Sequence, residues 1–227
     1  MKDLFPVFVN LSGKTVLLVG GGEVARQKLA ALAPTGAHVV LVDPRAGEQV
    51  LSWGGEGSLS LARGVYSPEL LAGVSLVFAA TDDPAVNHRV AADAEARGIW
   101  ANVVDDPAHC RFHTPSILRR GAFTVAVSSG GGFPGFTRAL RRVLERLLPV
   151  EDDGALARLF SLRERLIASG APAEERSRAL KLLAQWFEWT YLKPGVEPQR
   201  QDGGWPEDFP DQSAAPWVKE YPPRWLN

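Results

Sequence analysis

Residues 14–25 read Lys-Thr-Val-Leu-Leu-Val-Gly-Gly-Gly-Glu-Val-Ala, in which an apolar run leads directly into three glycines. The run predicts a buried strand over residues 16–19, and the segment 24–33 predicts a helix. Gly20, Gly22 and Ala25 occupy the fixed positions of the pattern G-x-G-x-x-G/A, which is typical of dinucleotide-binding turns. Gly20 permits the turn, Gly22 lets a pyrophosphate approach the backbone, and Ala25 lets helix and strand pack closely. The amide groups at the helix start would then face the phosphates.

A second apolar strand over residues 38–42 ends in Asp43, a little over twenty residues after the first glycine. A carboxylate at this place accepts hydrogen bonds from an adenosine ribose 2′-hydroxyl, which favours NAD over NADP. Arg45 lies close by and is the residue that would favour NADP instead. A glycine turn that binds no ligand is the alternative to both. We expect bound NAD.

The composition is that of an ordinary globular protein, with 45% hydrophobic and 22% charged residues among 227. This length predicts one large domain with an appendage. A net charge of -1 gives no reason to expect nucleic acid or a membrane surface as partner. Cys110 is the only cysteine, which excludes an internal disulfide and a multi-cysteine metal site. The start lacks the apolar core of a signal peptide and no run is long enough to cross a bilayer, so we expect a cytoplasmic enzyme.

Strands alternate with helices through the first half of the chain. The pattern predicts strands over residues 16–19, 38–42, 58–61, 76–80 and 99–104, and helices over 24–33, 44–53 and 84–97. This order indicates an α/β fold with a Rossmann-type parallel sheet and right-handed crossovers. Ligands of such sheets lie outside the carboxyl ends of the strands. We therefore expect three segments to converge on the cofactor, namely Gly20–Val24, Ala80–Asp82 and Asn102–Asp106, with Asp43, Pro44 and Arg45 at its adenosine end.

Arginines gather in the region after His109. A strand is predicted over residues 123–127, and a helix over 135–148 with Phe136, Leu140, Val143, Leu144 and Leu147 on one face. Between His109 and Arg146 there are seven arginines and one acid. They form either a solvated helix face or a cleft for a polyanion, since guanidinium groups pair with carboxylates in a bidentate manner. Before any family is considered, the two interpretations are equally supported.

The C-terminal part has a different character. Residues 153–169 and 172–191 predict two amphipathic helices, and the tail beyond Pro194 is rich in proline, tryptophan and acids. Tryptophans are costly to leave in water, so we expect this tail to lie extended over the protein's own surface. The predicted divisions are a Rossmann domain at 1–108, a segment at 109–148, a small helical domain at 149–194 and the tail at 195–227.

Two carboxylates, Asp105 and Asp106, follow the predicted strand over residues 99–104. An aspartate at this edge takes a proton, holds a substrate N–H or contributes to a metal site, whereas Asp-Asp-Pro is also ordinary turn chemistry. His109, Cys110 and His113 suggest a metal, but the flanking prolines argue against the regular helix that this spacing needs. We predict no metal ligands. Nothing in the sequence stabilises a Cys110 thiolate as a nucleophile.

Together these residues resemble the dehydrogenase/ferrochelatase module of siroheme synthases, the precorrin-2 dehydrogenase family. The resemblance covers about residues 4–148. Its motifs in order are Leu4-Phe5-Pro6-Val7-Phe8, Val19–Ala25, Ala79–Asp83, Asn87 and Arg89, Asn102–Asp105, Pro115-Ser116-Ile117, Ala126–Gly131 and the arginine-rich helix. The ordered combination is far more specific than the glycine pattern alone.

The resemblance implies a homodimer that oxidises precorrin-2, a tetrapyrrole, to sirohydrochlorin with NAD. In some members the same cleft inserts ferrous iron to give siroheme. Asp105 corresponds to the aspartate used in both activities, and Ser129 to a serine that is phosphorylated in some relatives. The implied cofactor contacts are Gly22, Glu23, Val24, Asp43, Pro44 and Arg45. Precorrin-2 carries eight carboxylates, which favours the cleft interpretation of the arginines. The predicted substrate-binding residues are Ser129, Arg119, Arg138, Arg141 and Arg142.

The sequence also departs from this family. The methyltransferase domain of trifunctional siroheme synthases has no counterpart, so we expect methylation to occur elsewhere. The tail after Pro194 is not part of the pattern, and His109 and His113 are not carried over from it. A dinucleotide-binding sensor without catalysis is the alternative function. A chelatase with a vestigial nucleotide fold is a third hypothesis, which the intact Gly20, Gly22, Ala25 and Asp43 weaken.

Overall fold

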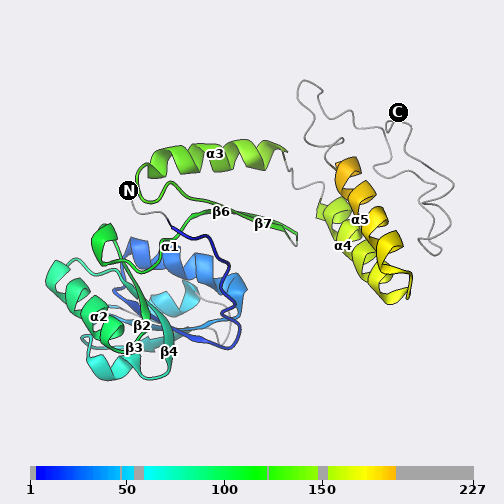
Figure 1. The fold of residues 1–227 in the computed structure, drawn as a ribbon. Helices are drawn as coiled ribbons and strands as arrows, with labels where there is room; N and C mark the ends of the chain where they lie inside the picture. Colours follow the sequence, from blue (N-terminus) through cyan, green and yellow to red (C-terminus); the bar gives the residue numbers. More distant parts are fainter. Residues whose placement is uncertain (1–3, 47, 54–58, 122, 148–152, 188–227) are drawn as a thin grey trace. The chain divides into compact units, whose positions relative to one another are not determined.

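The computed structural model describes residues 4–46, 48–53, 59–121, 123–147 and 153–187 (Figure 1). The chain divides into two compact units. The first comprises Met1–Thr114 with Gly130–Gly132, and the second comprises Pro115–Ser129 and the chain from Phe133 onward. The predicted division after residue 108 lies shortly before this point. The predicted extended tail over residues 195–227 lies outside the described residues.

The first unit is built on a five-stranded parallel sheet with the order β3-β2-β1-β4-β5. Its strands are β1 (Thr15–Val19), β2 (His38–Val42), β3 (Leu59–Ala62), β4 (Val74–Ala79) and β5 (Trp100–Val103). This order is that of the Rossmann fold, and it places the switch of chain direction between β1 and β4. The predicted Rossmann-type sheet is therefore confirmed.

Helices cover both faces of this sheet (Figure 1). Leu17 and Val19 of β1 belong to the core that includes Val90 of helix α2 (Pro84–Ala96). Val16 and Leu18 belong to the opposite core, which includes Leu29 of helix α1 (Glu23–Leu32). Because β1 is buried on both faces, it reads as an uninterrupted apolar run rather than as an alternating one.

One predicted helix of this unit is wrong in extent and type. Residues 44–53 were expected to be helical, but only a 3-10 helix, η2 (Glu48–Trp53), forms there. Three further 3-10 turns join the main elements, and the sequence pattern had indicated none of them. They are η1 (Ala33–Thr35), η3 (Pro68–Leu71) and η4 (Pro107–His109). Each contains a proline at its first or second position, where the missing N–H costs nothing.

The described residues of the second unit form a hairpin and three helices. Strand β6 (Ser116–Arg120) pairs antiparallel with β7 (Phe123–Val127), and helix α3 (Pro134–Leu147) packs against β6. Helices α4 (Asp153–Ala168) and α5 (Ala173–Phe187) follow. Strand β6 was not predicted, because its sequence Ser-Ile-Leu-Arg-Arg places two apolar and then two charged residues side by side instead of alternating them.

None of the helices within the described ranges is both long and apolar enough to cross a bilayer.

Candidate functional site

The ends of β1, β2 and β4 are tied together at Gly20. Its N–H donates to the carbonyl oxygen of Val42 at 2.8 Å, and the N–H of Ala80 donates to that of Val19 at 2.8 Å. Gly20 has φ +111°, and a Cβ added there would lie 2.3 Å from the carbonyl oxygen of Ala80. Only glycine fits, because a side chain would strain the backbone and collide with the neighbouring strand end.

The turn then opens onto the start of helix α1. Gly22 is the N-cap residue with extended backbone, no side chain caps the helix, and a Cβ added at Gly22 would meet nothing within 4 Å. Val24 is exposed, whereas Ala25 is fully buried against the sheet. The first amide groups of α1 thus face an open space of the kind that accepts a phosphate.

Glu23 places a negative charge beside this opening, but its side chain turns back along the helix. Its carboxylate pairs with the guanidinium group of Arg26 at 2.6 Å and accepts a bond from Gln27 at 3.3 Å. The hydrogen bond from Arg26, followed by that from Gln27, lowers the pKa of Glu23 to about 2. The charge of Arg26 offsets that of Glu23 where a phosphate would approach.

Asp43 holds the glycine turn at the end of β2. Its two carboxylate oxygens accept hydrogen bonds from the backbone N–H of Gly21 at 2.7 Å and of Arg45 at 2.6 Å, and the residue is nearly buried. Each oxygen keeps a second lone pair for a ligand hydroxyl. The Arg45 guanidinium group pairs with Asp82 at 3.0 Å on the exposed surface, which links the segment after β2 to the segment after β4. Pro44 is exposed between them.

Asn87 of helix α2 fixes the segment after β4, and sequence reasoning did not place it in the site. Its Oδ1 accepts bonds from the N–H of Thr81 at 3.1 Å and from its hydroxyl at 2.7 Å, and its Nδ2 donates to the Thr81 carbonyl at 3.0 Å. Asn87 is buried. A buried amide that satisfies all three groups of Thr81 sets the direction of Ala80 and Thr81. The sequence signals were its place among the motifs of the resemblance and an asparagine within a predicted helix.

Asp105 follows β5 and has φ +59°, the only positive φ at a non-glycine residue among those described. It lies in a turn that the N–H of Asp106 closes to the carbonyl of Val103 at 3.4 Å. The N–H of Val104 donates to the Ala79 carbonyl at 3.0 Å, so this turn is tied to the end of β4. An exposed aspartate in the left-handed region stores strain of about 1 kcal/mol, a cost that clusters at functional sites.

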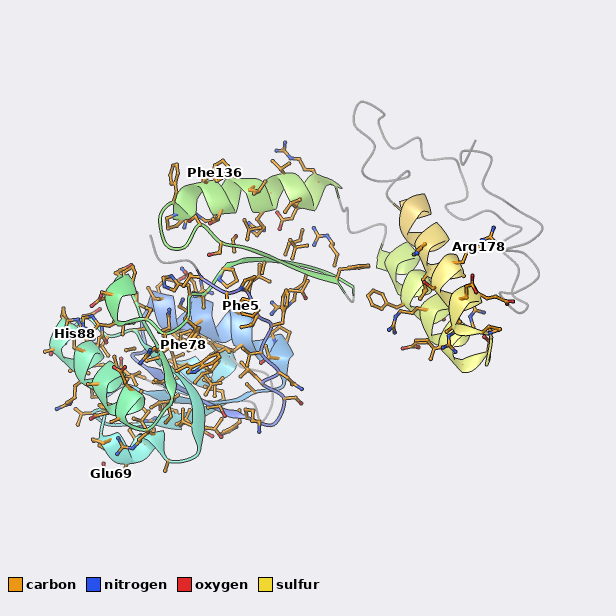
Figure 2. The ribbon with its side chains drawn as sticks, in the orientation of Figure 1. Phe5, Glu69, Phe78, His88, Phe136 and Arg178 are labelled. Carbon is orange, nitrogen blue, oxygen red and sulfur yellow. The ribbon has the colours of Figure 1, made fainter. Side chains whose placement is uncertain are left out.

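Lys28 of helix α1 is the second residue that sequence reasoning missed. Its Nζ donates to the Thr114 hydroxyl at 2.6 Å and lies 5.5 Å from the ring centroid of Phe78, which Figure 2 labels within the first unit. Burial lowers the pKa of Lys28, while the nearby Cys110 and Asp105 partly offset this effect. A half-buried ammonium group near Asp105 is suited to an anionic ligand.

The single cysteine has a structural environment. The Cys110 thiol contacts the carbonyl oxygens of Val103 at 3.2 Å and Asp106 at 3.3 Å, and its sulfur accepts from the N–H of Val103 at 3.2 Å. Asn102 donates to the Phe112 carbonyl at 2.9 Å. These bonds fasten the loop after β5 onto the strand.

The structure groups the histidines differently from the set His109, Cys110 and His113 that the sequence suggested. Among the described residues, the group able to hold a metal consists of His88, Asp106 and His109, with neither Cys110 nor His113. The hydrogen bond from His88, and then that from His109, lowers the pKa of Asp106. His88 comes from helix α2, a position that spacing along the sequence does not reveal.

The predicted substrate residues lie in the second unit. The Ser129 hydroxyl accepts from the N–H of Phe133 at 2.9 Å, just before α3 begins. Arg141 pairs with Glu145 on α3, and both are half-buried. Arg119, Arg138 and Arg142 are exposed. The role of these residues in substrate binding stays a prediction.

Helix α3 presents apolar residues outward. Phe136, Leu140 and Val143 are 58%, 38% and 50% exposed, and Figure 2 shows Phe136 projecting from the helix. Thr137, the residue after Phe136, is instead buried. Three residues of the predicted apolar face are therefore exposed in the part of the chain that the structure describes.

The strand order and the glycine turn at the switch point define a dinucleotide-binding Rossmann domain. Residues 7–116 match the family model described as putative NAD(P)-binding, so this part of the chain is an NAD(P)-binding domain.

The chain is related to siroheme synthases. It is 46% identical over 147 residues to a siroheme synthase of Photorhabdus laumondii, covering 65% of this chain and 31% of that protein. It is 44% identical over 177 residues to siroheme synthase 2 of Yersinia enterocolitica, covering 78% of this chain and 37% of that protein. The chain thus spans about a third of the length of these relatives. These relatives confirm the resemblance to siroheme synthases that the sequence indicated.

A solved structure supports the fold. The protein described as SirC, precorrin-2 dehydrogenase, matches with a TM-score of 0.66 and 22% identity. The match covers 79% of this chain and 89% of the solved one. At this identity the likeness shows a shared fold.

Proposed function

We propose that this chain is an NAD-dependent dehydrogenase that oxidises precorrin-2 to sirohydrochlorin. The observation that carries the proposal is Asp105, the aspartate with positive φ after β5, in a relative of siroheme synthases. Only β4 lies between β5 and β1, which leads into the intact dinucleotide turn. The names of the relatives and of the fold neighbour supply the substrate class. A cytoplasmic location is part of the same proposal.

Asp43 supports NAD rather than NADP. Its carboxylate is fixed by two backbone N–H groups and keeps lone pairs for the ribose hydroxyls, while its charge opposes a 2′-phosphate. Arg45 is paired with Asp82, which reduces its availability to a phosphate. When bound, NAD supplies the hydride acceptor. Gly20–Val24 and Ala80–Asp82 would hold its pyrophosphate and the neighbouring ribose.

Asp105 would act as the proton acceptor of the oxidation. Removal of two hydrogens from a tetrapyrrole sends a hydride to the cofactor and leaves a proton for a base. Asp105 is exposed and would therefore be accessible to the substrate. Lys28 would pair with a carboxylate of the substrate close to this base.

A homodimer is part of the proposal. The exposed stripe of Phe136, Leu140 and Val143 is costly to leave in water, and such stripes are typical of protein interfaces. A second copy of the same helix would cover it with a matching apolar surface. Arg138 and Arg142 lie on the other face of α3 and would meet the substrate's carboxylates there.

The test is an anaerobic assay with precorrin-2 and NAD, in which NADH and sirohydrochlorin are followed by absorbance. Wild-type protein should produce both in equal amounts. Asp105→Asn keeps the shape of the side chain and tolerates the same backbone conformation, so it should bind NAD normally but lose activity by about 100-fold or more. If wild-type protein binds NAD and oxidises nothing, the chain is a dinucleotide sensor instead.

Iron insertion is tested in a second stage. Ferrous iron is added only after oxidation has finished, and siroheme formation is compared with a protein-free control. Faster conversion with protein indicates a bifunctional dehydrogenase and ferrochelatase. Sirohydrochlorin that stays metal-free limits the function to oxidation.

A further inference from the structure

His88 of helix α2 meets Asp106 and His109 of the turn around η4 at one point. The Nε2 atom of His88 and the Nδ1 atom of His109 both lie 2.7 Å from the same oxygen of Asp106, Oδ2. All three ligand atoms lie within 4.8 Å of one another. The two imidazole rings are stacked, with centroids 4.3 Å apart and planes at 30°. His88 lies on helix α2 in Figure 2, and the other two residues belong to the turn around η4.

The carboxylate of Asp106 is already oriented. Its other oxygen, Oδ1, accepts a bond from the N–H of Ala108 at 3.2 Å as the N-cap of η4. This leaves Oδ2 directed at the two histidines. A ligand whose second atom is held by the backbone loses little entropy on binding a metal.

The position is also accessible. The side chains of His88 and His109 are 47% and 50% exposed, and that of Asp106 is 27% exposed. Each ring nitrogen that bonds to Oδ2 must bring a proton between itself and the carboxylate. A cation placed between the three atoms replaces those protons and is bound by neutral imidazoles.

We propose that His88, Asp106 and His109 form a binding site for an exchangeable divalent transition-metal ion. Two histidines and one carboxylate on one side of an ion are the donor set for Fe²⁺, Co²⁺ or Zn²⁺, and they leave coordination positions open to water or a ligand. Metal–ligand bonds of about 2.0–2.2 Å place neighbouring ligand atoms about 3 Å apart. The two distances from Asp106 Oδ2 to the histidine nitrogens are 2.7 Å. Each imidazole ring would have to move slightly away from this oxygen to admit the ion.

The chemistry of this site is separate from dinucleotide binding. His88 and His109 are hydrogen-bonded to Asp106 and not to the glycine turn. The three ligands would therefore bind the ion without NAD. The neighbouring Asp105 places the ion one residue from the base of the proposed oxidation. Metal binding and oxidation can therefore fail or succeed independently.

The experiment is a titration of untagged full-length protein with Co²⁺, followed by visible absorption and by calorimetry, in the absence of NAD. Wild-type protein should bind one equivalent and develop the ligand-field bands of a nitrogen–oxygen site. The double variant His88→Gln/His109→Gln should lose roughly tenfold or more in affinity, together with the bands. Asp106→Asn keeps the cap to Ala108 and removes the anionic ligand, so it should weaken binding to a similar degree.

Two histidine variants serve as controls. His38 is the first residue of β2, at the amino end of that strand, and His113 lies outside the triad. His38→Gln and His113→Gln should therefore bind Co²⁺ like the wild type. Unchanged thermal unfolding of each variant excludes a folding defect. Stoichiometric binding that survives the double substitution, or the lack of any Co²⁺ binding by folded wild-type protein, would overturn the proposal and leave a hydrogen-bonded triad.

Discussion

Helices α1 and α3 carry apolar residues with the same spacing, but only α1 covers them within the chain. Ala25, Leu29 and Leu32 of α1 are all buried against the sheet. The matching residues of α3 are Phe136, Leu140 and Val143, and all three are exposed. Helix α1 completes the core of its own unit, whereas these three residues of α3 stay exposed in the described chain.

This difference separates what a single chain can stabilise from what requires assembly. Burial of a leucine side chain contributes about 2 kcal/mol, so α1 draws its stability from the sheet beneath it. An exposed stripe contributes nothing until another surface excludes water from it. The same substitution in the two helices should therefore have different consequences.

Leu29→Asp and Leu140→Asp form the sharpest test of this contrast. At Leu29 a carboxylate would enter a fully buried position, which costs more than about 5 kcal/mol and should unfold the first unit. At Leu140 it would enter a position open to solvent in one chain, so the fold should persist while the dimer dissociates. Circular dichroism and analytical ultracentrifugation measure the two outcomes. A folded variant at Leu29, or an intact dimer at Leu140, would refute the comparison.

Two glycines of the turn separate folding from cofactor binding. Gly20→Ala places a Cβ 2.3 Å from a backbone oxygen at φ +111°, so we expect a loss of about 3 kcal/mol or more in unfolding free energy. Gly22→Ala meets no neighbour within 4 Å and should fold normally, yet its methyl group would occupy the space of the pyrophosphate. Thermal unfolding and NAD calorimetry distinguish them. Normal NAD affinity in Gly22→Ala would argue against phosphate binding at this turn.

The sequence was sufficient to predict much of the first unit, because its signals are local. The apolar runs of β1 and β2 and the glycines after β1 predicted two neighbouring strands and the turn between strand and helix. The strand predicted over residues 38–42 matches β2 in full. Strand β7 was also predicted with its observed bounds. Its partner β6 was missed, because that strand is specified by pairing with β7 and not by a pattern of its own.

The remaining site residues come from contacts that sequence order hides. Lys28 and Asn87 are polar residues inside amphipathic helices, where a solvated position is the usual expectation. Tertiary structure instead buries Asn87 against Thr81 and brings Lys28 near Asp105. His88 meets Asp106 only because α2 and η4 lie at the same end of the sheet. Such pairs cannot be inferred from spacing along the chain.

Lys28→Met should reduce substrate binding without reducing stability, which marks the residue as functional rather than structural. We expect KM for precorrin-2 to rise about tenfold, the value of one charged hydrogen bond, with NAD affinity unchanged. Lys14→Met, at an exposed position before β1, is the matched control. A proportional loss of NAD affinity would indicate a local folding defect instead.

The pH dependence of stability tests the same residue. Burial lowers the pKa of Lys28 below its ordinary value of 10.5, so above the folded-state pKa the unfolded chain binds more protons than the folded one. The contribution of Lys28 to stability should therefore rise with pH through that window and be absent from Lys28→Met. Thermal unfolding between neutral and alkaline pH measures it. Parallel curves for the two proteins would show that the ammonium group is fully hydrated.

Cys110→Ala should give the smallest effect, and it separates a structural thiol from a chemical one. The thiol contacts the backbone of Val103 and Asp106, so its loss should cost about 1 kcal/mol in unfolding free energy. Turnover should stay within about twofold of wild type, because the loop remains tied through Asn102 and the backbone of β5. A loss of activity without a loss of stability would instead give the thiol a chemical role. Asp105 and Asp106 lie between β5 and Cys110, so a loosened loop should also weaken Co²⁺ binding slightly. A purely nucleophilic role of Cys110 would not predict this effect on Co²⁺ binding.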